Sequence, residues 1–314
     1  MRTLRFGRYA IGFCLAIAVL SGCALRQTQG DVQPAVPSSL APSGSEQSWM
    51  APESQSSDLL YVSLEFSGVT NVYTYPGGKP AGGLTNTGYT FGLCSDKNGN
   101  VFITTQYAIY EYPHGLAVPV ATLTDPQGQP YSCSIDRATG KLAVGSNGGV
   151  AVYSPAGHNQ WYLPRLFNFQ SGVTSCTYDS AGNLFALSGA YSNKPHFSML
   201  PRGGSRFVPI SLNRNIPKPG NLEWDGKYLA VGSQHLFVHR FVIHGAQGTQ
   251  IGLVRLNGAS DLYQFWIEGS TIIGPTFNTY SSVGFWRYPH AGSVIKTIKA
   301  SGHAYGATVS LAPH

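Results

Sequence analysis

The chain has 314 residues, of which only 11% are charged, and its 20 Lys and Arg against 14 Asp and Glu give a formal charge of +6. Three of those arginines lie in the first 23 residues, and without them 17 basic residues face 14 acidic ones, a net charge of +3. No basic stripe accompanies this small excess, so we expect no nucleic-acid partner.

The first 23 residues predict an export signal. Three arginines precede an apolar run over residues 11–20, which is too short to span a bilayer comfortably. The run ends in Leu20-Ser21-Gly22-Cys23, which resembles the lipobox of bacterial lipoproteins. The resemblance implies that Cys23 becomes the N-terminus and carries fatty acyl chains such as palmitate, because two or more chains anchor a protein stably. An ordinary secretory signal with an incidental cysteine is the alternative.

Residue 24 is Ala, and the absence of Asp after the lipobox favours the outer membrane in the enterobacterial pattern. Residues 24–57 are rich in Gln, Pro, Ser and Ala and nearly lack aromatic residues, so they cannot bury enough apolar surface to offset their conformational entropy. We therefore expect a disordered tether over 24–57 and a folded domain over 58–314.

A short phrase, an aromatic or apolar residue followed by Pro and Gly, recurs through the folded part. It reads YPGG from residue 75, YPHG from 112, SPAG from 154, LPRGG from 200 and YPHAG from 288. Its prolines are 37, 42, 46 and 88 residues apart, and the last interval is two periods with one copy lost. A period in the low forties made of short strands is typical of a β-propeller, in which each repeat forms one four-stranded blade.

Each repeat predicts an inner strand, an acidic turn and three further strands. The second repeat, for example, predicts strands at 90–95, 101–105, 108–112 and 119–124, and the third predicts its outer strand at 160–163. The first repeat lacks an inner strand, whereas residues 305–310 form an inner-strand pattern without a blade of their own. We expect these residues to pair with 59–63 and to close a ring of six antiparallel blades, because closure removes open sheet edges.

Residues 92–103 (GLCSDKNGNVFI) resemble the inner-strand phrases of NHL-type and gluconolactonase-like six-bladed propellers. The resemblance implies a central channel in which acidic and Asn side chains hold a divalent cation such as calcium. The candidate ligands at the channel of this chain would be Asn221, Glu223 and Asp261, with Asn278 as a candidate fourth ligand.

The acidic residues fall into two classes. Asp96, Asp136, Asp179 and Asp225 recur at the turn after the inner strand, where they are expected to bind nearby backbone N–H groups. Glu223 is the acid placed inside an inner strand, and a structural role and a ligand-binding role are both open for it. Trp224 and Tyr263 either line an axial binding funnel or pack between blades.

Three cysteines, Cys94, Cys133 and Cys176, fall at nearly the same place in successive inner strands. They are interpreted as small buried residues near the narrow axis, and no C-x-x-C pair suggests a metal site. A disulfide between Cys133 and Cys176 is the alternative in an oxidising compartment, although spacing alone does not give a pairing.

The leading functional hypothesis is a lipid-anchored protein of the bacterial cell envelope that acts as an interaction scaffold or ligand-binding module. Its ligand would be a protein, a small molecule or a glycan, bound at a propeller face or the axial channel without cofactor or catalytic residues. The alternative is a metal-assisted hydrolase or lactonase that uses Glu223 in the channel.

Overall fold

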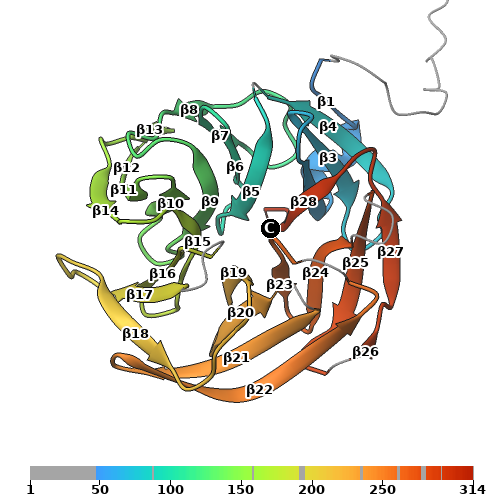
Figure 1. The fold of residues 1–314 in the computed structure, drawn as a ribbon. Coiled ribbons are helices and arrows are strands. Elements are labelled where there is room, and N and C mark those ends of the chain that lie inside the picture. The colour runs from blue at the N-terminus through green and yellow to red at the C-terminus, as the bar shows by residue number, and fades with distance from the viewer. Residues whose placement is uncertain are drawn as a thin grey trace, which may run out of the picture. The chain divides into compact units, whose positions relative to one another are not determined.

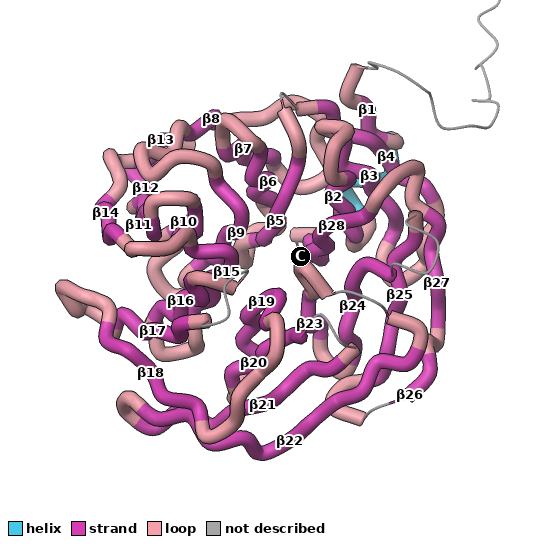
Figure 2. The backbone as a smooth tube through the Cα atoms, viewed as in Figure 1, coloured by secondary structure: helices cyan, strands magenta, loops and turns pink. Residues whose placement is uncertain are grey.

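The structure is a computed structural model that describes residues 47–313 except 87, 158, 191–194, 234–235, 260–261, 277–280 and 291. Its strands form sheets arranged radially around one axis, and a short 3-10 helix, η1 (Pro52–Ser56), completes the regular structure of this part of the chain (Figures 1 and 2). The predicted all-β propeller is confirmed. The signal segment and Cys23 lie outside the described residues, within which no helix is long and apolar enough to cross a membrane.

Each repeat folds into a sheet whose strands follow one another outward from the axis. The second repeat consists of β5 (Thr90–Ser95), β6 (Val101–Thr105), β7 (Ile109–Tyr112) and β8 (Ala121–Leu123). The third consists of β9 (Pro130–Ile135), β10 (Leu142–Ser146), β11 (Gly149–Tyr153) and β14 (Arg165–Asn168). The sixth consists of β23 (Trp266–Glu268), β24 (Thr271–Thr276), β25 (Ser282–Arg287) and β27 (Lys296–Lys299).

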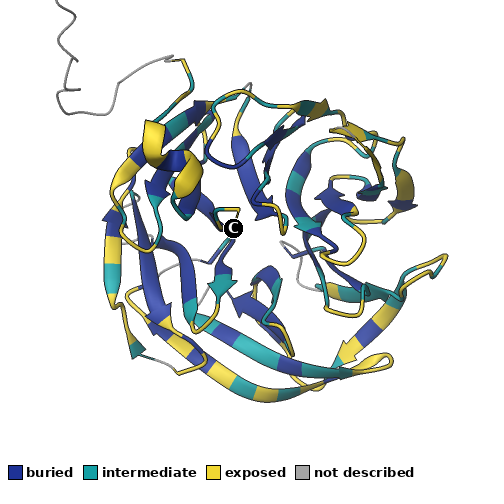
Figure 3. Ribbon diagram, turned by 180° about the vertical axis from the view of Figure 1, so that it is seen from behind, coloured by how far each residue is buried: buried dark blue, intermediate teal, exposed yellow. Residues whose placement is uncertain are grey.

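The fourth and fifth repeats are joined at their outer edges. The fourth consists of β15 (Val173–Tyr178), β16 (Leu184–Ser188), β17 (His196–Leu200) and β18 (Val208–Leu212). The fifth consists of β19 (Pro219–Trp224), β20 (Leu229–Ser233), β21 (Phe237–His244) and β22 (Gln247–Asn257). A short parallel pairing of β18 with β22 merges them into one sheet, and β26 (Gly292–Ser293) also pairs with β22. Exposed and buried residues alternate along much of β22, as expected of an outer strand (Figure 3).

The C-terminal strand completes the first sheet, as the sequence predicts. β28 (Ala304–Ser310) pairs antiparallel with β2 (Leu59–Leu64), in a register that places Leu59 opposite Ser310. β3 (Val69–Thr74) and β4 (Pro80–Thr85) follow outward. All residues of β28 and β2 are buried, so the two ends of the domain are held together by a full inner-strand ladder.

The folded body begins earlier than the predicted boundary at residue 58. β1 (Trp49–Met50) adds to the outer edge of β4, and η1 follows it. The Ser54 hydroxyl is buried and donates to the Ala81 carbonyl at 2.9 Å. Two residues of strand are too few to give an alternating pattern, and their Pro- and Ser-rich neighbours obscure them in the sequence.

The outer strand of the third repeat also differs from its prediction at 160–163. β12 (Pro155–Gly157) and β13 (Gln160–Trp161) form a separate hairpin, and β14 pairs with β11 instead. Phe167 of β14 is the anchor, because its ring is nearly buried and packs edge-to-face against Phe207 at 5.3 Å.

Hydrophobic clusters fill the spaces between neighbouring sheets. Between the first and sixth repeats, Leu60 and Val309 pack with Ile273 and Phe285. The axis is narrow, and small residues occupy it for that reason. A Cβ atom on Gly306 would collide with the Gln264 side chain, and one on Gly92 would lie 2.6 Å from the Tyr131 carbonyl oxygen.

Antiparallel strands send their loops alternately to two faces of the body. The turns after the inner strands (96–100, 136–141, 179–183, 225–228 and 269–270) lie on one side, which we call the pocket face. The segments before the inner strands, and those between second and third strands, lie on the other side, which we call the opposite face. Among the described residues, 65–68, 86, 88–89, 106–108 and 300–303 belong to the opposite face.

Candidate functional site

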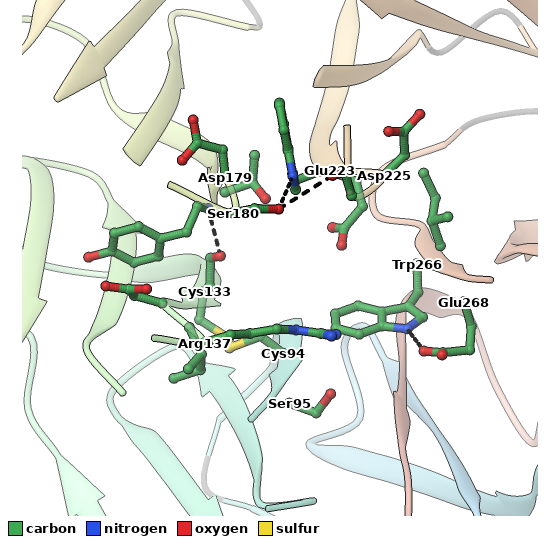
Figure 4. A pocket seen from close by; sticks show the side chains of 18 of the residues that line it. Cys94, Ser95, Cys133, Arg137, Asp179, Ser180, Glu223, Asp225, Trp266 and Glu268 are labelled. Atoms are coloured by element: carbon green, nitrogen blue, oxygen red, sulfur yellow. Dashed lines mark hydrogen bonds between the residues drawn. A yellow bond between two sulfur atoms is a disulfide. The ribbon is translucent and has the colours of Figure 1, made fainter. Parts of the chain in front are cut away.

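A cavity of about 250 Å³ opens on the pocket face, where the inner strands of five repeats end. β5, β9, β15, β19 and β23 and the turns after them provide its walls. Glu223, Trp266, Glu268 and Arg137 lie around it, and Figure 4 shows the Glu223 carboxylate pointing into the open space. We call this cavity the axial pocket.

The turn aspartates bind nearby backbone N–H groups as predicted, and three of them, Asp136, Asp179 and Asp225, line the axial pocket. Asp96 Oδ1 accepts hydrogen bonds from the N–H groups of Asn98 and Asn100 at 2.9 and 2.8 Å. Asp179 accepts an equivalent pair at 2.9 and 2.8 Å, and Asp136 and Asp225 accept from the backbone of their own turns. These carboxylates are therefore committed to local structure.

Asp225 has a second structural task at the rim. Its side chain is 2% exposed and pairs with Arg240, whose Nη2 lies 3.1 Å from Asp225 Oδ2. The Tyr288 hydroxyl donates to the same oxygen at 2.5 Å, and the Arg240 guanidinium lies over the Tyr288 ring at 5.1 Å. Tyr288 opens the last Tyr-Pro phrase, so this cluster fixes the fifth repeat against the sixth.

Glu223 is different, because no hydrogen-bond partner for its carboxylate occurs among the described residues. Its side chain keeps partial contact with solvent through the axial pocket, but protein surrounds it. This desolvation raises the pKa of Glu223 to about 8; the Arg137 charge lowers the pKa and Glu268 raises it. A carboxyl group held in a cavity without a protein partner is an unusual and costly arrangement.

The raised pKa gives a testable dependence of stability on pH. The folded state prefers protonated Glu223. The stabilising contribution of this protonation is fully present below pH 4.5, the ordinary pKa of a Glu side chain, and is lost as the pH rises through about 8. Glu223→Gln stays neutral, and we expect it to be more stable than the wild type by about 2 kcal/mol at pH 9 and equal to it at pH 4. Urea denaturation at both pH values measures this, with Glu268→Gln as the control variant. Equal stability of Glu223→Gln and wild type at pH 9 would refute the assignment.

Two tryptophans at the axial pocket are held in place by hydrogen bonds. Trp266 Nε1 donates to Glu268 Oε2 at 3.1 Å, and Trp224 Nε1 donates to the Ser180 hydroxyl at 2.8 Å. Trp224 also stacks on Phe185 at 6.2 Å, which is the between-blade packing that the sequence left open. Both rings nevertheless contribute to the wall.

Sequence reasoning did not assign Glu268 or Arg137 to the site. A signal existed for Glu268, because the sixth repeat has Glu where four other repeats have a turn-forming Asp. The longer side chain reaches the Trp266 indole instead of its own turn. Arg137 gives no sequence signal, since an exposed arginine in a turn is ordinary.

Asn221 lies deeper on the axis, outside the lining of the axial pocket. It is buried, accepts a hydrogen bond from the Ser175 hydroxyl at 2.6 Å and donates to the Phe265 carbonyl at 3.3 Å. Its amide therefore connects three inner-strand regions, and both of its polar atoms are used.

The Gln264 side chain bridges the axis beyond Asn221, on the side away from the axial pocket. Its side-chain amide donates to the Leu93 carbonyl at 2.6 Å and accepts from the Leu93 N–H at 2.9 Å, as a neighbouring strand would. Tyr263 lies on the far side of this bridge and stacks on Tyr305 at 5.6 Å. Tyr263 and Glu223 thus do not share a site. Asp261 and Asn278 lie outside the described residues.

The disulfide pairing differs from the sequence alternative. Cys94 of β5 and Cys133 of β9 are bonded, and both border the axial pocket (Figure 4). Cys176 is a buried free thiol, in contact with the Ser132 hydroxyl at 3.8 Å, and burial raises its pKa to about 12. Cys94 lies next to Cys133 because of how β5 and β9 are shifted relative to each other along the axis. This shift is set when the sheets pack into a ring, so the sequence spacing does not show it.

Within the described part of the chain, no group of three or more His, Cys, Asp or Glu could hold a metal ion. The oxygen ligands required by a hard cation are thus not brought together by those residues. What the axial pocket offers is one unpaired carboxyl group, a second carboxylate and two indole rings.

Comparison with known proteins identifies the fold. No protein-family model and no curated protein matches the sequence. A chain of a nidogen/laminin complex has a TM-score of 0.62 at 15% identity and covers 82% of this chain and 100% of its own. A protein of unknown function from Bacteroides caccae gives 0.64 at 9%, covering 81% and 99%. The Swd1 β-propeller domain of Myceliophteria thermophila gives 0.56 at 10%, covering 85% and 90%. These similarities show a β-propeller and do not distinguish the NHL or gluconolactonase types.

Proposed function

We propose that this protein is a lipid-anchored binding module of the bacterial cell envelope and that its axial pocket binds a cationic group. The β-propeller fold fits a protein-interaction or ligand-binding module. One of the similar structures is a complex of two proteins, nidogen and laminin, which supports the proposal that a propeller face of this chain contacts another protein. Acylated Cys23 would attach the body to the membrane.

The observation that carries the binding role is the partnerless carboxyl group of Glu223. The carboxylate lies at the wall of the axial pocket and has no protein partner among the described residues, so it is available to pair with a ligand cation. A ligand cation would lower the raised pKa of Glu223 and ionise it, because an opposite charge favours the charged form. Glu268 adds a second negative charge, and the Trp266 ring offers a face for a cation–π contact.

The size of the axial pocket defines the class of ligand. Its volume of about 250 Å³ is below the usual range for drug-sized molecules, so it suits a group the size of an amino-acid side chain. A primary ammonium or a guanidinium group has both the positive charge and the small size that the axial pocket requires. The group could belong to a small molecule or to the side chain of a protein partner. Arg137, which is exposed at the rim, is the nearest competing cation.

Binding should strengthen with pH in a defined range. The probes butylammonium and butylguanidinium stay charged, while Glu223 ionises with a pKa of about 8. Their affinity for the full chain should therefore rise about tenfold per pH unit below 8 and level off above it. Isothermal titration calorimetry measures this. Glu223→Gln should abolish binding across the pH range, and Arg137→Ala should strengthen binding. Binding with no pH dependence, or binding retained in Glu223→Gln, would reject the role of Glu223.

The second candidate is a metal-assisted hydrolase or lactonase. Glu223 favours it because its carboxylate points into the axial pocket, where it could serve as an oxygen ligand for a hard cation (Figure 4). Metal analysis of the purified protein separates the two functions. Stoichiometric calcium or zinc that is lost in Glu223→Gln would place the hydrolase first.

A further inference from the structure

Three aromatic side chains are exposed together on the opposite face. Phe66, Tyr89 and Tyr107 have exposed fractions of 62%, 44% and 64% and lie in segments of the first and second repeats. The rings of Phe66 and Tyr89 meet edge-to-face at 5.4 Å. The Gln106 N–H donates to the Tyr89 carbonyl at 2.9 Å, which connects the segment that carries Tyr107. We call these three residues the aromatic patch; contiguous exposed apolar surface marks interaction sites.

The backbone holds Phe66 outward at an energetic cost. Its φ of +65° is in the left-handed region, which is uncommon for a bulky residue. The segment is fixed on both sides, because the Glu65 N–H donates to the His303 carbonyl at 2.9 Å and the Ser67 hydroxyl donates to the Leu64 carbonyl at 3.0 Å. Strained residues of this kind concentrate at functional sites.

The segments around the aromatic patch carry little charge. Glu65 is the charged residue in the segments that carry the aromatic patch, and its Oε2 lies 3.2 Å from His303 Nδ1. The pocket face carries many more charges, including the following turn residues: Asp96, Lys97, Asp136, Arg137, Lys141, Asp179, Asp225 and Lys227. The aromatic patch is therefore a weakly charged region, whereas the turns around the axial pocket carry several charges of both signs.

The chain enters the body at the edge of the opposite face. The Thr85 N–H donates to the Ser48 hydroxyl at 2.9 Å, and Trp49, which is 45% exposed, pairs with Gly83. Residues 24–46 connect this point to Cys23, a segment of 23 residues (46 minus 23). If these residues form the tether that the sequence predicts, their root-mean-square span is about 25 Å. An anchor at Cys23 would keep this face close to the bilayer and raise its effective concentration there.

We propose that the aromatic patch docks on the lipid surface, so that the opposite face lies against the bilayer and the axial pocket faces away from it. The inference rests on the lipid anchor of the proposed function. Tyr and Phe suit this place, because aromatic side chains favour the membrane–water interface and Tyr combines an apolar ring with a polar tip. Three side chains bind a bilayer weakly by themselves, but a tether converts weak contact into stable docking.

The test uses the full acylated protein in vesicles of phosphatidylcholine and phosphatidylglycerol. A fluorophore is attached at Gln106→Cys beside the aromatic patch or, as a control, at Arg202→Cys in the loop after β17 on the pocket face. Cys94 and Cys133 are bonded and Cys176 is buried, so labelling is selective. A quencher carried on the lipid headgroup should quench the label at 106 strongly and the label at 202 weakly.

Replacing all three aromatic residues with Ser should lower the ratio of docked to undocked bodies by roughly tenfold to a hundredfold. Sedimentation with vesicles should stay unchanged, because Cys23 still anchors the chain. Tyr107→Ser alone should give a smaller loss, and circular dichroism melting checks the fold of each variant.

The possible failures are distinguishable. If mass spectrometry finds no acyl chain on Cys23 and the protein does not sediment with vesicles, the anchor is wrong. If the protein sediments but the labels at 106 and 202 are quenched equally, docking of the aromatic patch is wrong. Protection of residue 106 that requires an added polysaccharide or protein, with lipid having no effect, would assign the patch to that ligand class and overturn the proposal.

Discussion

Deleting residues 304–314 should abolish cooperative folding. The deletion removes β28, all of whose residues are buried, and exposes the whole inner edge of β2. It also removes the hydrogen bonds that Ser95 and Ser63 make to β28 at 2.7 and 3.0 Å. We expect a loss of about 5 kcal/mol or more, which approaches the total stability of most domains.

Thermal and urea unfolding followed by circular dichroism measure this loss. The matched control deletes only residues 312–314, which removes the Ala312 hydrogen bond to Asp58 and leaves the inner ladder intact. That variant should unfold within a few degrees of the wild type, at about 1 kcal/mol of cost. A cooperative, near-wild-type transition after deletion of residues 304–314 would show that the ring does not depend on its closing strand.

Replacing Cys94 and Cys133 together with Ser should destabilise the protein by about 4 kcal/mol. The disulfide joins the inner strands of the second and third repeats, 39 residues apart, and an unfolded chain with that loop closed has less entropy to gain. The bond also borders the axial pocket, so its loss should loosen two of the five walls.

Urea denaturation with and without a thiol reductant tests the disulfide. Reductant should lower wild-type stability to that of the double variant and leave the double variant unchanged. Cys176→Ala is the control, because this buried thiol makes only weak sulfur contacts near 3.8 Å. If reductant affected the wild type and the double variant equally, the stabilising effect would come from elsewhere.

The two effects act on different parts of the ring. Closure by β28 joins the two ends of the domain, whereas the disulfide joins two repeats that already follow each other in the chain. The disulfide directly joins two walls of the axial pocket. The aromatic patch depends on neither cysteine, and this independence allows pocket and patch to be tested separately.

The candidate site was only partly accessible to sequence reasoning. Glu223 was identified because an acid inside an inner strand interrupts a pattern of small and apolar residues, and the structure places it at the axial pocket. Asn221 was a candidate through the gluconolactonase resemblance and Tyr263 as part of an aromatic funnel. The structure places neither in the lining of the axial pocket, and the Gln264 side chain bridges to Leu93 across the axis. Asp261 stays a prediction. No sequence pattern indicated that Gln264 would pair with Leu93, 171 residues away.

The sequence by itself determined the repeated sheets, the aspartate turns and the closing strand at 305–310, because strand alternation, turn chemistry and repeat spacing are local properties of the chain. Only the tertiary structure decided that Cys94 pairs with Cys133, that Glu268 bonds to Trp266 and that Glu223 shares a cavity with Arg137. These neighbours depend on how far each inner strand is shifted along the common axis. That shift is set by the packing between sheets, and no single repeat encodes it.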